Sequence, residues 1–387
     1  MFNMFTTLAV LLTISASGCT PESENFLKLR EPKSPSTVPL AVKAKLSKGV
    51  NFSLWFAQRE DYPWSMLMTR VTPQDIAAVK VAGFKHIRIP VEPESLEWNP
   101  KTRKFSTTKL AFFRQNIDEM RRIGLYVIVD FHPNPDKQVR LSTTASYRDE
   151  IKNFWIDLIK VLKDIPSEQI GFEAYNEPIF NNQVLWRSYQ EELLTSMRAE
   201  VPEHTLFATA EPWGSLGPLT QFAPYSDKNI MYVFHYYEPM VVSHQGAKWT
   251  EMTKDIKGLQ YPFNQKNFDT VLAQQTNPDT RYMLQDFGKK KWNSSMIDAD
   301  MKRIRNWANR NSVDIICTEF GCVEKTDTVS RANLITDIRK ALDRNMIPWS
   351  FWDYNSQMGI SREPSYYKNI SPKMLQYLGM PRSKYNP

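Results

Sequence analysis

The chain has 387 residues, of which 42% are hydrophobic and 12% aromatic, so it can bury a large core and is not a mainly disordered protein. Its net charge of +7 is spread along the sequence without a basic stripe or a groove-entering motif, so we expect no nucleic-acid partner. Three cysteines are too few for a disulfide scaffold or a four-cysteine zinc site.

The first residues have the pattern of an export signal. Residues 1–18 carry no charged side chain, contain an apolar stretch from Leu8 to Ile14 and end in small residues before Cys19. This stretch is too short to span a membrane permanently. The order Ala-Ser-Gly-Cys at positions 16–19 resembles a bacterial lipobox, which implies lipidation of Cys19. We therefore expect an exported protein, either an envelope-anchored lipoprotein or a periplasmic or secreted one, whose only membrane contact is that lipid.

The segment that follows has the composition of a linker. Residues 19–45 are rich in Pro, Ser, Lys and Glu and have little apolar periodicity, which predicts a flexible tether. One catalytic domain is then expected over residues 46–387.

From Gly49 onward, short apolar runs alternate with helical patterns, which is typical of βα units around a parallel sheet. Leu110, Phe113 and Ile117 form one helical stripe, and Gly124 stands where that helix would end. Eight strands are predicted, at residues 49–55, 85–91, 125–131, 169–175, 205–210, 230–235, 313–319 and 347–352. Eight such units predict a (β/α)8 TIM barrel. The alternative is a doubly wound sheet, but no phosphate-binding G-x-G-x-x-G or Walker A turn follows the first strand.

The connection after the sixth predicted strand is unusually long. It runs from Glu238 to about Ser294, contains the sequence HQGAKW and has few helical stripes. Long loops of this kind are usually functional. We expect it to form a wall of a cleft at the C-terminal face of the barrel.

Polar side chains recur at the C-terminal ends of the predicted strands, where TIM barrels carry their catalytic groups. In chain order they are Arg88, His132, Asn176, Glu177, His235, Tyr237, Glu319 and Trp352. Two carboxylates on separate strands can face each other across the barrel mouth, as retaining glycoside hydrolysis requires, at a separation of roughly 5 Å. Arg88 would keep Glu319 ionised, and a more apolar setting would keep Glu177 protonated.

With this ordered set, the chain resembles glycoside hydrolase family 5 over most of residues 46–387. The resemblance implies that Glu177 is the acid/base and Glu319 the nucleophile. It also implies that Asn176 binds the sugar 2-OH, that Tyr237 steadies the nucleophile and that Trp352 stacks under the sugar. The remaining matched residues, Arg88, His132 and His235, would orient the carboxyls and the substrate. HQGAKW resembles one bacterial branch of the family, which brings His244 and Trp249 near the cleft.

Other residues are assigned from their positions on or next to the predicted strands. Trp55 and Trp213 stand at or just after strand ends, where aromatic rings could contact sugar. Glu173 is interpreted as a structural carboxylate with His86 as its partner, and Cys317, which shares the strand parity of Glu319, is expected to point into the barrel.

The activity expected from these residues is internal cleavage of β-1,4-glucan by a monomer without a cofactor. No metal-ligand spacing occurs among the five histidines, so no metal site is predicted. A β-mannanase or an exo-β-1,3-glucanase would use the same residues, because loops determine the choice of sugar. A non-catalytic carbohydrate-binding barrel is the alternative from another class.

Overall fold

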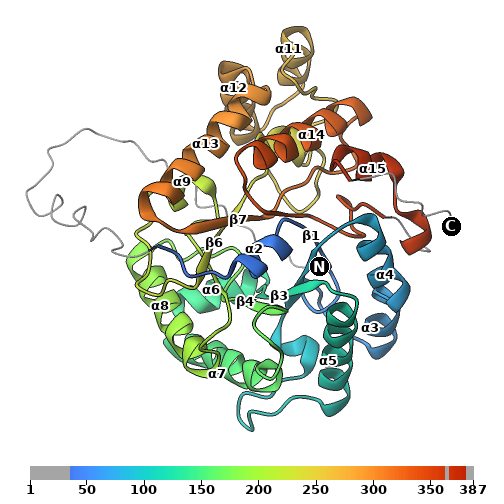
Figure 1. Ribbon diagram of the computed structural model, residues 1–387. Helices are drawn as coiled ribbons and strands as arrows, with labels where there is room; N and C mark the ends of the chain where they lie inside the picture. Colours follow the sequence, from blue (N-terminus) through green and yellow to red (C-terminus); the bar gives the residue numbers. More distant parts are fainter. Residues whose placement is uncertain (1–34, 362–365, 381–387) are drawn as a thin grey trace, which may run out of the picture.

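The computed structural model describes residues 35–361 and 366–380. Eight strands close into a barrel in which each strand pairs in parallel with the next and β1 pairs with β8 (Figure 1). The strands are β1 (Lys48–Asn51), β2 (His86–Val91), β3 (Tyr126–Phe131), β4 (Ile170–Glu173), β5 (Leu206–Thr209), β6 (Ile230–His235), β7 (Asp314–Glu319) and β8 (Trp349–Phe351). Each lies within or one residue outside its predicted range, so the (β/α)8 prediction is confirmed and the doubly wound alternative is wrong.

Helices surround this barrel, close one end of it or lie outside the helical ring (Figure 1). They are α2 (Leu40–Lys45), α3 (Trp64–Arg70), α4 (Pro73–Ala82), α5 (Thr107–Arg122), α6 (Pro135–Thr143), α7 (Ala145–Leu162), α8 (Gln183–Glu200), α9 (Leu216–Leu219), α10 (Met240–Ser243), α11 (Gln265–Ala273), α12 (Pro278–Lys290), α13 (Ser294–Asn311), α14 (Thr328–Arg344) and α15 (Pro372–Tyr377), with 3-10 turns η1 (Pro93–Leu96) and η2 (Tyr366–Asn369). The two ends of α4 show how the sequence sets helix bounds. Thr72 and Asp75 form a capping box, Pro73 is the first helical residue, and Gly83 ends the helix at a φ of 101°.

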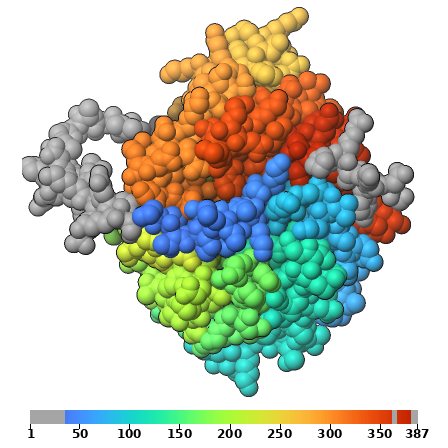
Figure 2. Space-filling model, in the orientation of Figure 1, coloured from blue at the N-terminus to red at the C-terminus, as the bar shows by residue number. Residues whose placement is uncertain are grey.

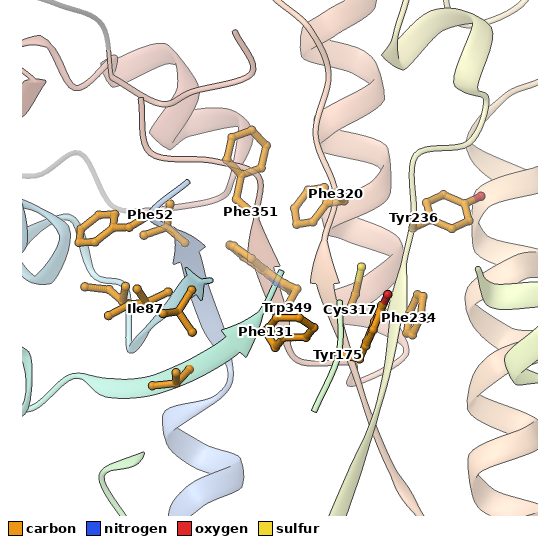
Figure 3. Packing of buried hydrophobic residues seen from close by; sticks show 14 of the residues in the cluster. Phe52, Ile87, Phe131, Tyr175, Phe234, Tyr236, Cys317, Phe320, Trp349 and Phe351 are labelled. Atoms are coloured by element: carbon orange, nitrogen blue, oxygen red, sulfur yellow. The ribbon is translucent and has the colours of Figure 1, made fainter. Parts of the chain in front are cut away.

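Strand side chains alternate between two apolar layers, as the twofold period of a strand requires. The larger cluster joins the outward-facing strand residues to the helices, and Figure 3 shows some of its members. The smaller cluster lies inside the barrel and combines Tyr126, Ile128, Phe207, Met231, Val233 and Ile316 with three residues that precede β1. The barrel is therefore a packed core, and the polar site lies above its inner layer.

The three preceding residues are Val38, Val42 and Leu46, and their burial corrects the predicted end of the tether. Val42 lies on α2 and is fully buried, while Leu40 on the same helix is 82% exposed. Lys43 pairs with Asp314 at 2.6 Å. Residues 35–46 form a plug, which lies across the middle of the face seen in Figure 2. In the plug, only every fourth residue, at positions 38, 42 and 46, packs into the barrel. Three such positions are too few for a helical pattern to be recognised in the sequence.

The connection after β6 is more regular than predicted. It contains α10, α11 and α12, and the last two lie outside the ring of helices at the top of Figure 1. Phe263, Phe268 and Phe287 pack these two helices together, with ring centroids 5.4–6.4 Å apart. The expectation of a long loop with few helices is thus wrong for residues 265–290.

The N-terminal predictions concern a part of the chain that is not described. Residues 1–34, including the export signal, Cys19 and most of the tether, lie outside the described residues. Within the described residues, no helix is long and apolar enough to cross a membrane.

Candidate active site

A single buried arginine connects the strands at the barrel mouth. Arg88 on β2 is fully buried and contacts three carboxylates. Its Nε and Nη2 lie 2.7 and 2.8 Å from the two oxygens of Glu173, its Nη2 lies 3.0 Å from Asp130, and its Nη1 lies 2.8 Å from Glu319. A guanidinium with five rigidly arranged donors can hold several acceptors at once. Arg88 therefore fixes the positions of β3, β4 and β7 relative to one another at the site.

The structural role predicted for Glu173 fits this geometry, but its predicted partner is wrong. His86 lies two residues deeper on β2, and its Nε2 lies 2.6 Å from Ser350 Oγ. Glu173 instead pairs bidentately with Arg88. Register explains the difference, because Asp130 and Glu173 are direct neighbours across β3 and β4 and both reach the same guanidinium.

A bulge between β6 and β7 sets the direction of Glu319. Phe234 pairs with Cys317, and His235 pairs with Glu319, so Thr318 is an extra residue in the ladder. A bulge of this type changes which side chains face the same way. Thr318 and Glu319 both contact residues at the mouth, and Cys317 packs in the outer core. The expectation that Cys317 points into the barrel is therefore wrong.

Two carboxyl groups meet at this mouth. Glu177 follows β4, Glu319 ends β7, and His235 at the end of β6 lies between them. The Nδ1 of His235 is 2.6 Å from Glu177 Oε1 and 3.6 Å from Glu319 Oε2. One carboxylate oxygen of each glutamate and a ring nitrogen of His235 all lie within 4.8 Å of one another. This separation fits the roughly 5 Å of a retaining pair and not the roughly 6.5–9.5 Å of an inverting pair.

The two glutamates have different surroundings. Glu319 accepts hydrogen bonds from Arg88 at 2.8 Å and from the Tyr237 hydroxyl at 2.9 Å, and its side chain is 5% exposed. Glu177 contacts only the imidazole of His235 among the hydrogen bonds of the described residues, and its side chain is 24% exposed. Two fixed donors favour the ionised form of Glu319, and the more open position of Glu177 lets it exchange a proton.

The electrostatics of the pair follow from burial. Burial raises the pKa of Glu177 to about 7, against the opposing effect of His132 and Arg88. Burial also raises the pKa of Glu319, and His235 and Arg88 oppose this rise. Because the two groups lie close together, their protons leave in steps that belong to the pair. At neutral pH, this site can hold one proton on Glu177 and one negative charge on Glu319.

The two site histidines are neutral. Burial lowers the pKa of His132 to about 4 and that of His235 to about 4, despite the nearby carboxylates. Thr318 Oγ lies 3.1 Å from His235 Nε2. A neutral imidazole can either donate to a carboxylate or accept from a carboxylic acid, so the contact between His235 and Glu177 survives a proton transfer.

Aromatic rings line one side of the mouth. Trp352 directly follows β8, and its ring stacks on His132 with the centroids 5.6 Å apart. The ring centroid of Tyr237 lies 4.9 Å from that of His244, and the His244 centroid lies 6.1 Å from that of Trp249. These rings lead from Glu319 outward, and Trp249 at their end is 55% exposed.

The other two tryptophans have opposite environments. Trp213 follows β5 and is 52% exposed, so its ring is free to contact a ligand. Trp55 is fully buried, donates from Nε1 to Leu67 O and packs against Phe52 and Phe56. A sugar cannot reach it, so the expectation of sugar contact is wrong for Trp55. The chain turns after Asn51, which ends β1 four residues earlier than predicted, and this turn directs Trp55 into the core.

Three residues at the site were not identified in the sequence. Asp130 contacts Arg88 and His132, Asn51 accepts from Arg88 Nη1 at 3.0 Å, and Thr318 contacts His235. Asp130 could have been predicted from the sequence, because it lies two positions before His132 and so on the same strand face. Thr318 could not, because its direction depends on the bulge.

Glu177, His235 and Glu319 also form a group whose ligand atoms could hold a metal ion by proximity alone. Glu319 is already paired with Arg88, however, and a guanidinium next to a ligand oxygen repels a cation. The donor set therefore fits carboxylate chemistry better than metal binding.

Comparison with known proteins identifies relatives of the whole barrel. The model of the family described as Cellulase (glycosyl hydrolase family 5) matches residues 46–358. Endoglucanase 3 of Fibrobacter succinogenes is 25% identical over 345 residues, which are 84% of this chain and 52% of that protein. This chain thus spans about half the length of that relative. Endoglucanase C of Acetivibrio thermocellus is 23% identical over 313 residues, which are 79% of this chain and 90% of that protein.

Solved structures show the same fold. The endoglucanase Cel5A of Thermotoga maritima superimposes with a TM-score of 0.73 at 21% identity, covering 88% of this chain and 100% of that one. The cellulose synthase subunit Z of Clostridioides difficile gives a TM-score of 0.70 at 19% identity, covering 86% and 99%.

Proposed function

This chain belongs to glycosyl hydrolase family 5, and from that premise we propose that it is a retaining endo-β-1,4-glucanase in which Glu177 is the acid/base and Glu319 the nucleophile. The observation that carries this proposal is the pair of carboxyl groups with oxygens within 4.8 Å of each other, one held by Arg88 and Tyr237 and the other bound by His235. The endoglucanases among its relatives, and a hyperthermophilic endo-β-1,4-glucanase among the structures of the same fold, support β-1,4-glucan as the substrate.

In the first step, a carboxylate oxygen of Glu319 attacks the anomeric carbon and the bond to the leaving oxygen breaks. Glu177 gives its proton to that oxygen, so the leaving chain departs as an alcohol and Glu177 becomes ionised. The raised pKa of Glu177 keeps the proton available at neutral pH. The product is a glycosyl ester of Glu319.

In the second step, Glu177 takes a proton from water and the water oxygen attacks the same carbon. The ester bond breaks, Glu319 regains its negative charge, and Glu177 is protonated again. Arg88 and the Tyr237 hydroxyl stabilise the returning carboxylate. Two inversions leave the product with the configuration of the substrate.

The remaining residues bind the sugar. Asn176 donates to the 2-OH, and Trp352 stacks under the ring at the point of cleavage. Trp213 and Trp249 are each more than half exposed and serve as platforms for neighbouring sugars. Arg88, His132 and His235 orient these groups, as their hydrogen bonds indicate.

The test is reducing-sugar release by the purified chain from β-1,4-glucan, β-1,3-glucan, mixed-linkage glucan and mannan, with Glu319→Gln alongside. We expect turnover of β-1,4-glucan that the substitution abolishes. Turnover of mannan alone or of β-1,3-glucan alone would reject the glucanase assignment in favour of the other family activities. Binding of glycan without turnover of any would indicate a non-catalytic barrel.

We also propose that the protein is exported and acts as a monomer tethered through a lipid on Cys19. The tether would end at the plug of residues 35–46, which covers the end of the barrel opposite the carboxylates. The cleft would thus face away from the membrane. Labelling with a clickable fatty acid should mark the wild-type chain and not Cys19→Ser; equal labelling of both would reject the anchor.

A further inference from the structure

Asp130 lies directly beneath the residues that bind the sugar, although no step of the reaction uses it. It is fully buried near the end of β3. One oxygen, Oδ2, lies 2.9 Å from His132 Nδ1 and 3.0 Å from Arg88 Nη2. The other oxygen, Oδ1, is buried and has no hydrogen-bond partner among the described residues. Asp130 Oδ2 thus accepts a hydrogen bond from His132 and forms an ion pair with Arg88.

This contact determines which nitrogen of His132 carries the proton. Burial raises the pKa of Asp130 to about 7, and the Arg88 guanidinium 3.0 Å away opposes this rise and favours the carboxylate. The oxygen of that carboxylate accepts, so His132 Nδ1 is the donor. Burial lowers the pKa of His132 to about 4, so the ring is neutral and has only one N–H. His132 Nε2 is then a free acceptor, although the Nε2–H form would put a donor there instead.

The acceptor on His132 in turn sets the orientation of the Asn176 amide. Asn176 Nδ2 lies 3.1 Å from His132 Nε2, and Asn176 Oδ1 lies 2.7 Å from Arg88 Nη2. If the amide were turned over, its oxygen would face the lone pair of His132 and its NH2 would face the guanidinium. Both contacts would be repulsive. With the observed orientation, one Nδ2–H remains, which no hydrogen bond among the described residues uses.

We propose that Asp130 is a positioning residue that, through the tautomer of His132, holds the Asn176 amide with an N–H directed to the sugar 2-OH. This inference rests on the proposed function, since it assigns to Asn176 the 2-OH of a β-glucoside. The transition state of glycoside hydrolysis strengthens contacts to the 2-OH, so the orientation of this amide acts on the rate. Asp130 itself does not touch the substrate.

Three variants of the full chain test the tautomer. Asp130→Ala removes the acceptor, whereas Asp130→Asn keeps an oxygen in the place of Oδ2 and puts its NH2 in the place of Oδ1, which has no hydrogen-bond partner among the described residues. Asp157→Ala is the matched control, because Asp157 on α7 accepts from the ring N–H of Trp98 and from Arg103 in the helical layer. The readout is the 15N spectrum of the five histidines, with His132→Gln used to assign the signal.

We expect His132 to be protonated at Nδ1 in the wild type, in Asp130→Asn and in Asp157→Ala, and to lose this form in Asp130→Ala. An unchanged Nδ1–H signal in Asp130→Ala would overturn the proposal. If Asp130→Ala does not fold, the Asn variant decides: loss of the Nδ1–H form there would equally overturn it, because an acceptor is still present.

Kinetics test the link to the sugar. On an aryl β-cellobioside, Asp130→Ala should lower kcat/KM by about 100-fold, the effect of a catalytic contact displaced by about 1 Å. On the analogue that lacks the 2-OH of the cleaved sugar, the loss should be within about threefold, because the contact is absent already. Asp157→Ala should show no such difference between substrates, and Asp130→Asn should lie closer to wild type than to Asp130→Ala.

An equal loss on both substrates would mean that Asp130 acts on the carboxylates or the fold, and would reject the proposal. Absence of wild-type activity on every glucan and glucoside would reject the proposed function instead, and the 15N spectra would still decide the tautomer.

Discussion

The two ends of the barrel are filled by opposite means. At the C-terminal end, Arg88 and three carboxylates are buried together, and each is held by specific hydrogen bonds. At the N-terminal end, the plug of residues 35–46 closes the barrel with apolar side chains, Val38, Val42 and Leu46. The dark-blue segment in Figure 2 marks this closed end.

The difference indicates a division between activity and stability. A buried charge network costs desolvation energy, and a well-packed apolar replacement is often as stable or more so. Apolar packing stabilises by about 1.5–3 kcal/mol for each fully buried Val or Leu. Removing one member of the Arg88 network would leave a buried charge without its partner and lower stability as well as turnover. A change at Glu177, which does not pair with Arg88, should therefore reduce turnover far more than stability, and changes at the plug should do the opposite.

The largest expected effect tests the mouth. Glu177→Ala removes the proton donor, so substrates with poor leaving groups, such as cellulose fragments, should lose about 10²–10⁴-fold in kcat. Aryl glycosides with a good leaving group should lose much less in the glycosylation step. Steady-state and burst kinetics on the two substrate types measure this difference. An equal loss in glycosylation for both types would show that Glu177 is not the acid.

The pH dependence sharpens the same assignment. The pKa of Glu177 is raised to about 7 by burial, and the proton donor is the reacting form. As the pH rises above this pKa, kcat/KM should thus fall by about tenfold per unit. The acid limb should report deprotonation of the pair, with Glu319 ionised in the active form. A profile that stays flat up to about pH 9 on a poor leaving group would contradict this account.

The plug should show the reverse pattern. A chain beginning at Leu46 loses two buried valines, and its free energy of unfolding should fall by roughly 3–6 kcal/mol relative to a chain beginning at Pro35. Where both are folded, kcat should be the same. Denaturant titration measures the stability, and an equal stability would show that the plug does not contribute.

Two neighbours on α2 provide the control for that comparison. Val42→Ala should destabilise by about 2 kcal/mol, because Val42 is fully buried. Leu40→Ala should have almost no effect, since Leu40 is 82% exposed. Similar losses in both would indicate an effect of helix formation and not of packing.

The smallest effect is expected at the exposed platform Trp213. Loss of one sugar–aromatic contact, about 0.5–1.5 kcal/mol, should raise KM for long glucans by about 2–10-fold in Trp213→Ala and leave cellobiosides unchanged. Trp55→Ala should instead lower stability, because Trp55 is buried in the core. An unchanged KM for Trp213→Ala on long glucans would show that Trp213 does not contact the substrate.

The sequence predicted the parts of this molecule that follow regular periodicity. Strand ends could be placed from apolar runs, and polar residues at those ends therefore met at the mouth. The failures have local causes: a bulge gave Glu319 a different direction from Cys317, an early strand end directed Trp55 into the core, and the plug around Val42 was too short for a pattern. The partner of Glu173 depended on register, which no single strand reveals.

The central claim is that Glu319 attacks the anomeric carbon. The most direct measurement is to trap the ester with an activated 2-deoxy-2-fluoro-β-cellobioside and locate the label by mass spectrometry of peptides. We predict one cellobiosyl unit per chain, on Glu319, and none in Glu319→Gln. A label on Glu177, or rapid turnover to the α-anomer without a covalent adduct, would contradict the assignment of the two carboxylates.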